Sequence, residues 1–253
     1  MLPLHQSGPC RGARPGTSSY FATGSGRCAT RGGPAGPAAV IVLAAGAGTR
    51  MKSRTPKILH EIGGRSMVAH ALMAARSVNP RQLAIVVRHE RDLVARHLAD
   101  VDPAAVIVDQ DDIPGTGRAV EVALQALDAT QPLAGTVVVT YGDVPLLSGA
   151  LLAELVATHE KEANAVTVLT AVLDDATGYG RILRGEDGTV TGIREHKDSS
   201  EAERLIREVN SGIYAFDAAV PPIGFEPILH GSKGRGAAIT PERTVPWHAA
   251  GHK

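Results

Sequence analysis

The stretch VIVLAAGAGTRMKSRTPK, from Val40 to Lys57, decides the fold that we expect for this chain. It opens with four apolar residues, three of them β-branched, which predicts a buried strand. Gly46 and Gly48 follow, and they remove side chains where a backbone could turn tightly and approach a ligand. Backbone N–H groups in such a loop can bind phosphate, and the residues after it are basic. The alternative is an ordinary glycine-rich turn, which the glycines alone favour because short glycine motifs are common by accident.

Two familiar phosphate loops do not match this stretch. A P-loop requires Gly-Lys followed by Ser or Thr, which is absent from it. A dinucleotide-binding fingerprint requires a third glycine, but that position holds Met51, which is too large for close helix–strand packing. What remains is LAAGAGTRM followed, five residues later, by Pro-Lys.

Composition excludes several classes of protein. The 253 residues suffice for one domain with a sizeable core, and 26 acidic residues balance 26 basic ones. Balanced charge and few aromatic residues argue against a nucleic-acid partner. No apolar run approaches the length of a membrane span, so we expect no membrane insertion. Cys10 and Cys28 both precede the first predicted strand and provide no disulfide or zinc framework, which favours the cytoplasm.

Beyond Val40, short apolar runs alternate with segments of helical period. Strands are predicted at 40–43, 83–87, 106–108, 136–140 and 165–173, and helices around 67–75, 93–98, 119–127 and 151–156. Continuously apolar strands separated by helices indicate an α/β fold with a doubly wound, mostly parallel, Rossmann-like sheet. Ligands then bind at the carboxyl ends of the strands.

The sequence YGDVP places Asp143 directly after the fourth predicted strand, at the same edge as the glycine loop. Opposite a triphosphate, such a carboxylate would hold Mg²⁺ through oxygen. The alternative is that Asp143 caps the following turn, which Gly-Asp and Pro favour. The nearby glycine loop favours the metal, because it already places phosphate charges to be neutralised.

Two further sets of polar residues have readings that stay open. Gln110 ends the third predicted strand before Pro-Gly-Thr-Gly, where an amide could pair with a base edge. By itself this pattern favours a polar strand end with Thr116 as a helix cap. After a predicted hairpin at Asp187-Gly188 come EHKD and VNSGIY. Their carboxylate and amide could bind sugar hydroxyls, or these residues could form a solvated charged loop.

Together, LAAGAGTRM…PK, QDDIPGTG, YGDVP, GYGRI, EHKD and VNSGIY resemble one family. It is the family of bacterial bifunctional N-acetylglucosamine-1-phosphate uridyltransferases and glucosamine-1-phosphate acetyltransferases, of which residues 40–217 resemble the uridyltransferase part. The resemblance implies a nucleotide-diphosphosugar transferase fold of the GT-A-like type. It implies the joining of UTP and N-acetylglucosamine 1-phosphate to give UDP-N-acetylglucosamine and pyrophosphate, a step toward peptidoglycan and lipopolysaccharide.

The resemblance also implies roles for individual residues. Those implied to bind the nucleotide are Leu43, Ala44, Ala45, Gly46, Lys57, Gln110, Gly115 and Thr116. Those implied to hold the amino sugar are Gly180, Glu195 and Asn210. Arg50 and Lys57 are implied to be catalytic, through the charge on the leaving phosphates, and Asp143 is implied to bind Mg²⁺.

The sequence departs from the family pattern in several places. Arg88 stands where the family usually has a small residue, and Arg118 replaces a common His. Residues 1–39 are rich in Gly and Pro and contain no acidic residue, so we expect a disordered leader. Residues 218–253 lack the family's second metal-binding Asn, its EYYLTD-like run and its hexapeptide repeats. We expect a disordered tail there, produced by a frameshift or truncation, with the family's trimer contacts in the missing part.

Two alternative functions remain. One is a fragment that binds nucleotide sugar with little or no turnover, which the aberrant tail favours. The other is a related sugar-1-phosphate nucleotidyltransferase, against which EHKD and VNSGIY speak.

Overall fold

The computed structural model describes residues 36–46, 48, 51, 53, 55–164 and 166–219, and the backbone of 243–247. The expected disorder of the leader concerns residues of which nearly all lie outside these ranges. Within the described ranges, no helix has the length and apolar character needed to cross a membrane.

A nine-stranded mixed sheet carries the fold, with strand order β11-β7-β10-β6-β1-β4-β5 and the β8–β9 hairpin joined through β8 to β10. Its strands are β1 (Ala39–Leu43), β4 (Gln82–Val87), β5 (Val106–Asp109), β6 (Thr136–Tyr141), β7 (Val166–Val172), β8 (Arg181–Arg184), β9 (Val190–Arg194), β10 (Glu208–Asp217) and β11 (Arg243–Trp247). Strand β1 pairs in parallel with β4 and β6, and β4 pairs in parallel with β5. The predicted mostly parallel α/β sheet is therefore confirmed.

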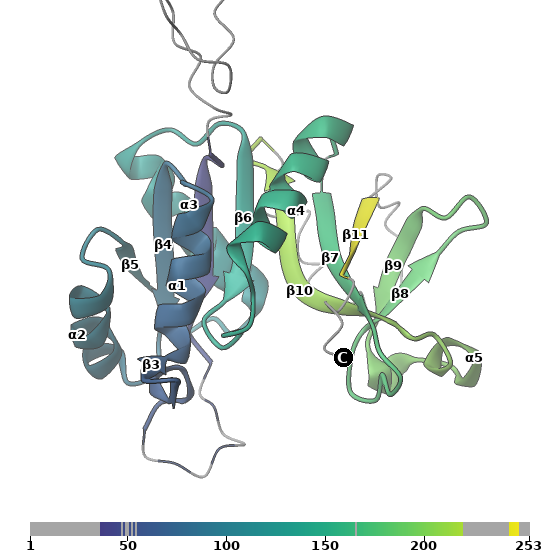
Figure 1. Ribbon diagram of the computed structural model, residues 1–253, viewed down its shortest axis with the longest axis horizontal. Helices are drawn as coiled ribbons and strands as arrows, with labels where there is room; N and C mark the ends of the chain where they lie inside the picture. Colours follow the sequence, from purple (N-terminus) through teal and green to yellow (C-terminus); the bar gives the residue numbers. More distant parts are fainter. Residues whose placement is uncertain are drawn as a thin grey trace, which may run out of the picture. The chain divides into compact units, whose positions relative to one another are not determined.

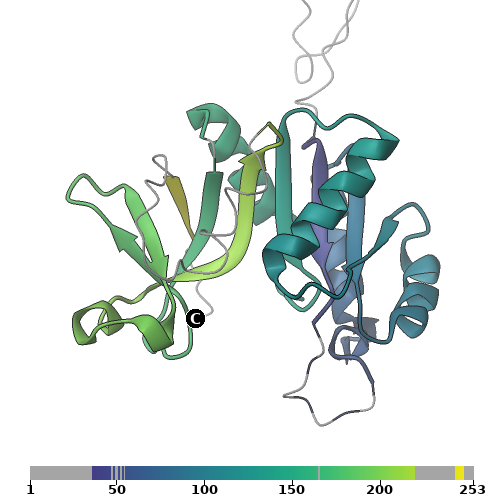
Figure 2. The ribbon, with the colours of Figure 1, turned by 180° about the vertical axis from the view of Figure 1, so that it is seen from behind.

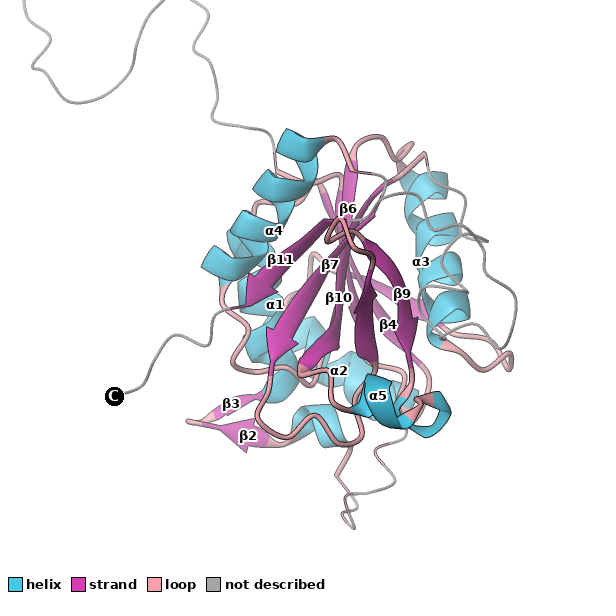
Figure 3. Ribbon diagram, turned by 90° about the vertical axis from the view of Figure 1, so that its right-hand side faces the viewer, coloured by secondary structure: helices cyan, strands magenta, loops and turns pink. Residues whose placement is uncertain are grey.

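Helices cover both faces of this sheet (Figures 1, 2 and 3). Helices α1 (Met67–Ser77), α2 (Arg91–Val101) and α4 (Gly149–Glu162) contribute to one apolar core. Helix α3 (Thr116–Thr130) contributes to the other. Figure 3 shows α1 and α4 on one side of the strands and α3 on the opposite side. Such two-sided cover explains why the central strands are apolar at nearly every position.

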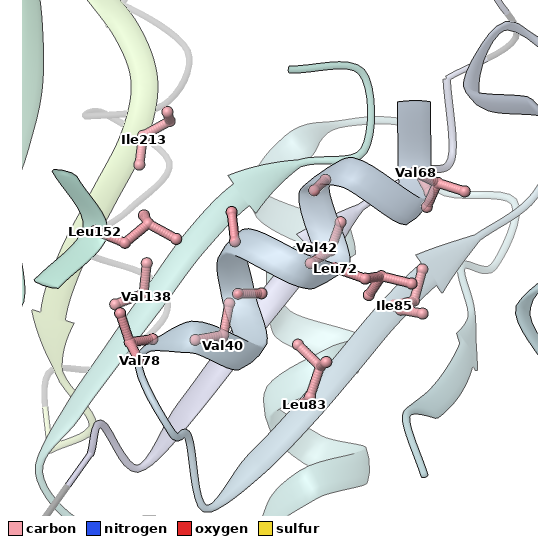
Figure 4. Packing of buried hydrophobic residues seen from close by; sticks show 14 of the residues in the cluster. Val40, Val42, Val68, Leu72, Val78, Leu83, Ile85, Val138, Leu152 and Ile213 are labelled. Carbon is pink, nitrogen blue, oxygen red and sulfur yellow. The ribbon is translucent and has the colours of Figure 1, made fainter. Parts of the chain in front are cut away.

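Strand β1 illustrates how the sequence produces both cores. Its side chains alternate between the faces of the sheet. Val40 and Val42 pack toward α1, together with Leu72 and Ile85 (Figure 4), whereas Ile41 belongs to the core beneath α3. All five residues of β1 are buried, so neither face of this strand tolerates a polar residue without cost.

Short elements connect the main ones. They are the 3-10 helices η1 (Lys57–Leu59) and η2 (His196–Asp198), the two-stranded β2 (Glu61–Ile62) and β3 (Arg65–Ser66), and α5 (Glu201–Arg204). Hydroxyl caps begin two of the large helices: Ser66 accepts a hydrogen bond from Ala69 N, and Ser148 accepts one from Leu151 N. The hairpin predicted at Asp187-Gly188 is confirmed as the turn between β8 and β9.

Strand β10 is one of the elements that the apolar pattern does not predict. It runs antiparallel between β6 and β7 and, near its start, also pairs with β8. Its sequence contains Asn210-Ser211-Gly212, which interrupts the apolar alternation, and its register to β7 shifts between Asn210 and Tyr214. The irregularity is a bulge, which lets one strand bend and join two parts of the sheet (Figure 1).

Five residues of the tail for which we expect disorder have a described backbone. Arg243–Trp247 form β11, which pairs in parallel with β7 at the edge of the sheet. An unpaired edge offers free backbone N–H and C=O groups, and a short segment with adjacent Thr and Val can satisfy them. Proline is tolerated on such an edge strand, which has only one neighbour.

Candidate functional site

A cavity of about 570 Å³ opens at the carboxyl ends of β1, β4 and β6. Residues from the glycine loop, η1, the start of α3 and the strand ends line it: Leu43, Ala44, Ala45, Gly46, Gly48, Met51, Lys57, Ile58, Arg88, His89, Gln110, Pro114, Gly115, Thr116, Ala119, Tyr141 and Asp143. All the residues predicted to bind nucleotide, and the predicted metal ligand Asp143, are among them. The cavity lies where ligands bind in open parallel sheets.

The glycine loop crosses the first strand end of this cavity. Gly48 has φ +59°, and a Cβ there would lie 3.0 Å from Cβ of Lys57, so this position requires glycine on two counts. Leu43 O accepts a hydrogen bond from Gly142 N, which joins the loop of β1 to that of β6. Arg50, the other predicted catalytic residue, lies outside the described residues.

Lys57 and Asp143 face each other across the cavity. Lys57 Nζ donates to Asp143 Oδ2 over 2.6 Å, although the two residues are 86 positions apart in the sequence. Their side chains are 38% and 34% exposed, so solvent and ligands reach both. The fold therefore holds a cationic and an anionic group in contact at the site where phosphates and a divalent cation would meet.

Gln110 sits at the end of β5 with its amide turned into the next loop. Its Nε2 donates to Ile113 O at 3.1 Å and to Gly115 O at 3.0 Å. Because backbone carbonyls only accept hydrogen bonds, these two contacts fix which end of the amide is nitrogen. Gly115 has φ +130° and precedes α3, whose first residue is Thr116. The side chain of Gln110 thus shapes the loop that brings Gly115 and Thr116 to the cavity.

The three residues predicted to hold the sugar form a row across β9, β8 and β10. Arg181 pairs with Arg194 on one side and with Val209 on the other, so Gly180 falls opposite Glu195 and Asn210. Asn210 N donates to Gly180 O at 2.9 Å. A Cβ at Gly180 would lie 3.2 Å from Glu195 Oε1 and 3.7 Å from Asn210 Cβ, which shows how closely the row is packed.

Tyr141, which is not among the predicted site residues, links the row to the cavity. Burial raises the pKa of the Tyr141 hydroxyl, a hydrogen bond with Thr116 lowers it, and the carboxylates of Asp143 and Glu195 raise it further. Its ring also lies against Gly212, where a Cβ would come within 2.6 Å of Cε2. The signal that could have found Tyr141 is its place between a buried strand and Asp143.

Arg88 and His89 are further cavity residues that the predicted site omits. They follow β4, a central strand whose carboxyl end lies between those of β1 and β5. Arg88 Nη2 donates to the backbone oxygen of Asp112 at 3.3 Å. The rule that ligands meet the strand ends of a parallel sheet could have found both residues, because they are the first to follow β4.

The chemistry of the cavity fits a divalent cation held by one carboxylate. Among the described residues, no three or more His, Cys, Asp and Glu side chains form a metal cluster. Asp143 lines the cavity with a partly exposed carboxylate. Mg²⁺ commonly takes one or two protein carboxylates together with substrate phosphates and water, and this arrangement can supply the first of these.

Comparisons with known proteins agree with this geometry. The family model described as the MobA-like NTP transferase domain matches residues 40–209. A Bifunctional protein GlmU of Pseudarthrobacter chlorophenolicus is 89% identical over 185 residues, covering 73% of this chain and 38% of that protein. The same-named protein of Paenarthrobacter aurescens is 84% identical, over 73% of this chain and 37% of its own length. The chain thus spans less than two fifths of these curated relatives.

Solved structures show the same fold at low sequence identity. A putative glucose-1-phosphate thymidylyltransferase from Bacillus anthracis superposes with a TM-score of 0.59 at 17% identity, over 83% of this chain and 86% of that one. A UDP-glucose pyrophosphorylase complexed with UDP-glucose gives a TM-score of 0.58, also at 17% identity, over 77% and 80%. At this identity the likeness concerns the fold alone, and it agrees with the predicted nucleotide-diphosphosugar transferase architecture.

Proposed function

The chain belongs to the family of MobA-like NTP transferase domains, and from that premise we propose that it transfers a uridyl group from UTP to N-acetylglucosamine 1-phosphate. The products would be UDP-N-acetylglucosamine and pyrophosphate. The relatives that match at 89% and 84% identity are bifunctional proteins much longer than the matched region, so the proposal concerns this one activity. We assign it to the cytoplasm, as a supplier of cell-wall precursor.

The contact between Lys57 and Asp143 carries the proposal. The two groups lie 2.6 Å apart in a cavity that is also lined by the glycine loop and by Gln110 and Gly115. An ammonium and a carboxylate in this position suit different parts of one ligand, a metal-bound triphosphate. When that ligand enters, the ammonium of Lys57 would exchange its carboxylate partner for phosphate oxygens.

The transfer requires no covalent intermediate. An anionic oxygen of the sugar phosphate attacks the α-phosphorus, and a new P–O bond forms as the bond from that phosphorus to the β-phosphate oxygen breaks. The electron pair of the broken bond leaves on pyrophosphate. Lys57 would stabilise the charge that grows there, and such preorganised contacts are commonly worth a few kcal/mol of barrier. We propose that Arg50 assists at the same phosphates.

Asp143 would hold Mg²⁺ at the phosphates, and the bound ion would supply charge neutralisation there. The carboxylate is the side chain through which this chain would fix the position of the ion. Leu43, Ala44, Ala45 and Gly46 would line the nucleotide beside it, with backbone groups close enough to contact phosphate.

Gln110 supports uracil as the base. Both of its amide hydrogens have acceptors within the loop, so its carbonyl oxygen is the part that remains to accept from a ligand. The ring N3–H of uracil is a donor, whereas the corresponding nitrogen of cytosine is an acceptor. A base that presents N–H at this position is therefore favoured, and Gly115 and Thr116 would complete the edge.

The row of Gly180, Glu195 and Asn210 supports a hydroxyl-rich acceptor with an amide. A carboxylate accepts from sugar hydroxyls, and the absence of a side chain at Gly180 lets its backbone lie close to Glu195 and Asn210. Asn210 Oδ1 already accepts from Gly212 N at 2.9 Å and from Tyr214 Oη at 3.0 Å. The amide nitrogen of Asn210 would therefore face the acetamide oxygen.

The test is pyrophosphate release by the full 253-residue chain. With Mg²⁺, UTP and N-acetylglucosamine 1-phosphate, we expect pyrophosphate and UDP-N-acetylglucosamine in equal amounts. Replacing UTP by CTP, or the amino sugar by glucose 1-phosphate, should lower the rate at least tenfold, about the selectivity of one lost hydrogen bond to a polar group.

Parallel calorimetry with UDP-N-acetylglucosamine separates the alternatives. Binding without turnover would replace the proposal by a nucleotide-sugar-binding function. Faster turnover with glucose 1-phosphate would replace it by a related nucleotidyltransferase. If the chain showed no binding and no turnover, the proposal would be refuted.

A further inference from the structure

We infer that Arg118 is a positioning residue for the nucleotide base, because it holds the loop that orients the amide of Gln110. The inference rests on the proposed function and deepens it, since it names what sets the choice of base. Arg118 lies in the first turn of α3, and the cavity-lining residues do not include it. It would therefore act through other residues.

The first step of the argument is the loop between Gln110 and Thr116. Gln110 keeps its carbonyl oxygen available only while its amide nitrogen bonds Ile113 O and Gly115 O. If Ile113 moved, one of these acceptors would be lost. The amide could then rotate and present nitrogen, a donor, where uracil requires an acceptor.

The second step is the contact that holds Ile113. Ile113 N donates to Asp111 Oδ1 at 3.2 Å, so the carboxylate of Asp111 fixes the backbone on the near side of this residue. The carboxylate in turn accepts at Oδ2 from Arg118 Nε at 2.9 Å and from Nη2 at 2.5 Å. A chain of hydrogen bonds thus runs from Arg118 through Asp111 and Ile113 to Gln110.

The third step is what keeps Arg118 in place. Its Nη1 lies 2.7 Å from Glu121 Oε2, one turn further along α3. The guanidinium therefore bridges the helix and the loop, and its hydrogen bond is the main cause that holds the pKa of Asp111 below the ordinary value. From the other side, Arg88 binds the backbone oxygen of Asp112. Both arginines that depart from the family pattern thus contact the same loop.

The expected effect is on selectivity more than on folding. Ion pairs between partly exposed side chains contribute little to stability. The Arg118 side chain is 24% exposed and that of Asp111 is 39% exposed, so removing either should leave the fold intact. Orientation of one amide, however, decides whether one hydrogen bond to the base is made.

The experiment measures dissociation constants of UDP and CDP for the full chain by calorimetry. Arg118→Ala should weaken UDP binding about fivefold and CDP binding less than twofold, the effect of about one hydrogen bond. Asp111→Ala should give the same loss, and the double variant should be no worse than either single one. Arg118→Lys, which retains the charge, should recover part of the preference.

Arg91→Ala is the matched control. Arg91 Nε lies 2.9 Å from Asp109 Oδ1, a comparable ion pair beside the same strand end, and the hydrogen bonds of Arg91 go to Asp109 and Asp92 rather than to the 111–113 loop. This variant should keep the parent ratio of UDP to CDP affinity. A parent-like ratio in Arg118→Ala, or an equal loss in Arg91→Ala, would refute the inference alone. A parent chain that binds no UDP would overturn the proposed function and this inference with it.

Discussion

The cavity at the strand ends and the row of Gly180, Glu195 and Asn210 hold their polar groups in different ways. The cavity gathers loops that follow the parallel strands β1, β4, β5 and β6, and side chains take part in many of its contacts, as from Lys57 to Asp143 and from Gln110 to Gly115 O. The row is set by the register of β9, β8 and β10, and its members are joined by the main chain, as from Asn210 N to Gly180 O.

This difference indicates what each region requires. In the proposed reaction, a triphosphate and a metal ion would exchange partners, so groups on loops with movable side chains would suit them. An acceptor sugar must be held in one orientation relative to the α-phosphorus, because misplacement by about 1 Å can cost roughly a hundredfold in rate. Backbone register holds the residues of the row at set positions relative to one another.

The largest expected effect is a loss of uridyl transfer when a polar group of the cavity is removed. Asp143→Asn should lower uridyl transfer about a hundredfold or more, because the amide binds Mg²⁺ and attracts charge far less than the carboxylate. Asp112→Asn is a suitable control, since its fully exposed carboxylate belongs to the neighbouring loop. Pyrophosphate release by Asp143→Asn within twofold of the parent, at saturating Mg²⁺, would remove Asp143 from the proposed site.

The second expected effect comes from a substitution in the row, which should leave the residues of the cavity in place. In Gly180→Val, the new Cβ would lie 3.1 Å from Ile193 Cγ2 and 3.2 Å from Glu195 Oε1. We expect the KM for the sugar phosphate to rise about tenfold, with the KM for UTP unchanged, since overpacking shifts neighbours. The measurement is initial-rate kinetics with each substrate varied.

Gly192→Val is the control for the row. It lies in β9, and a Cβ there would have no other atom within 4 Å. If Gly192→Val raised the same KM as much as Gly180→Val, the effect would be a property of the hairpin as a whole rather than of the row.

A third, smaller effect tests the link between the regions. Gly212→Ala places alanine in the left-handed region, at φ +80°, which is unfavourable for a residue with a side chain. Its Cβ would also lie 2.6 Å from Cε2 of Tyr141. Gly188→Ala has nearly the same backbone cost, at φ +79°, but a Cβ there has open space. Each should lose about 1 kcal/mol of unfolding free energy from the backbone, and Gly212→Ala a further 1–3 kcal/mol from overpacking.

Kinetics distinguish the two glycine variants further. Only Gly212→Ala should raise the KM of both substrates, because Tyr141 borders the cavity and lies near Glu195. Urea titration gives the free energies, and equal losses in the two variants would show that Tyr141 is not held by this contact.

The smallest effect concerns the contact between α4 and β7, the strand beside β10. His159 on α4 is buried, its Nδ1 lies 2.9 Å from Thr167 Oγ1 on β7, and burial lowers its pKa. The unfolded chain then binds the proton more readily than the folded one, so stability should fall as pH drops below about 6.5. Urea titration at several pH values should show that His159→Gln loses this part of the pH dependence, and an unchanged slope would contradict it.

Family resemblance named the nucleotide residues of the cavity, and the local patterns predicted the sheet edge at which those residues lie. Strands β1, β4, β5 and β6 are continuous apolar runs, and parallel strands place the residues that follow them at one edge. The predicted nucleotide residues therefore gather without knowledge of strand order. What the pattern could not provide is the contact between Lys57 and Asp143, because it depends on η1 and β6 meeting 86 residues apart.

The residues of the row could not be predicted from the periodicity of apolar residues. Gly180, Glu195 and Asn210 came from family resemblance, and their closeness depends on the register of three strands. Strand β10 itself is hidden by Asn210-Ser211-Gly212, since a bulge breaks the alternation that marks a strand. The orientation of the Gln110 amide likewise follows from carbonyl positions that only the folded loop defines.

The bend in β10 bears on how such a protein can diversify. One half of the strand is bonded to β6, which leads to the cavity, and the other half meets β8, which leads from the row of Gly180, Glu195 and Asn210. Under the proposed function, substitutions in the β8–β9 hairpin would therefore alter the acceptor side of the site, while the main-chain bonds to β6 would hold the donor side in place.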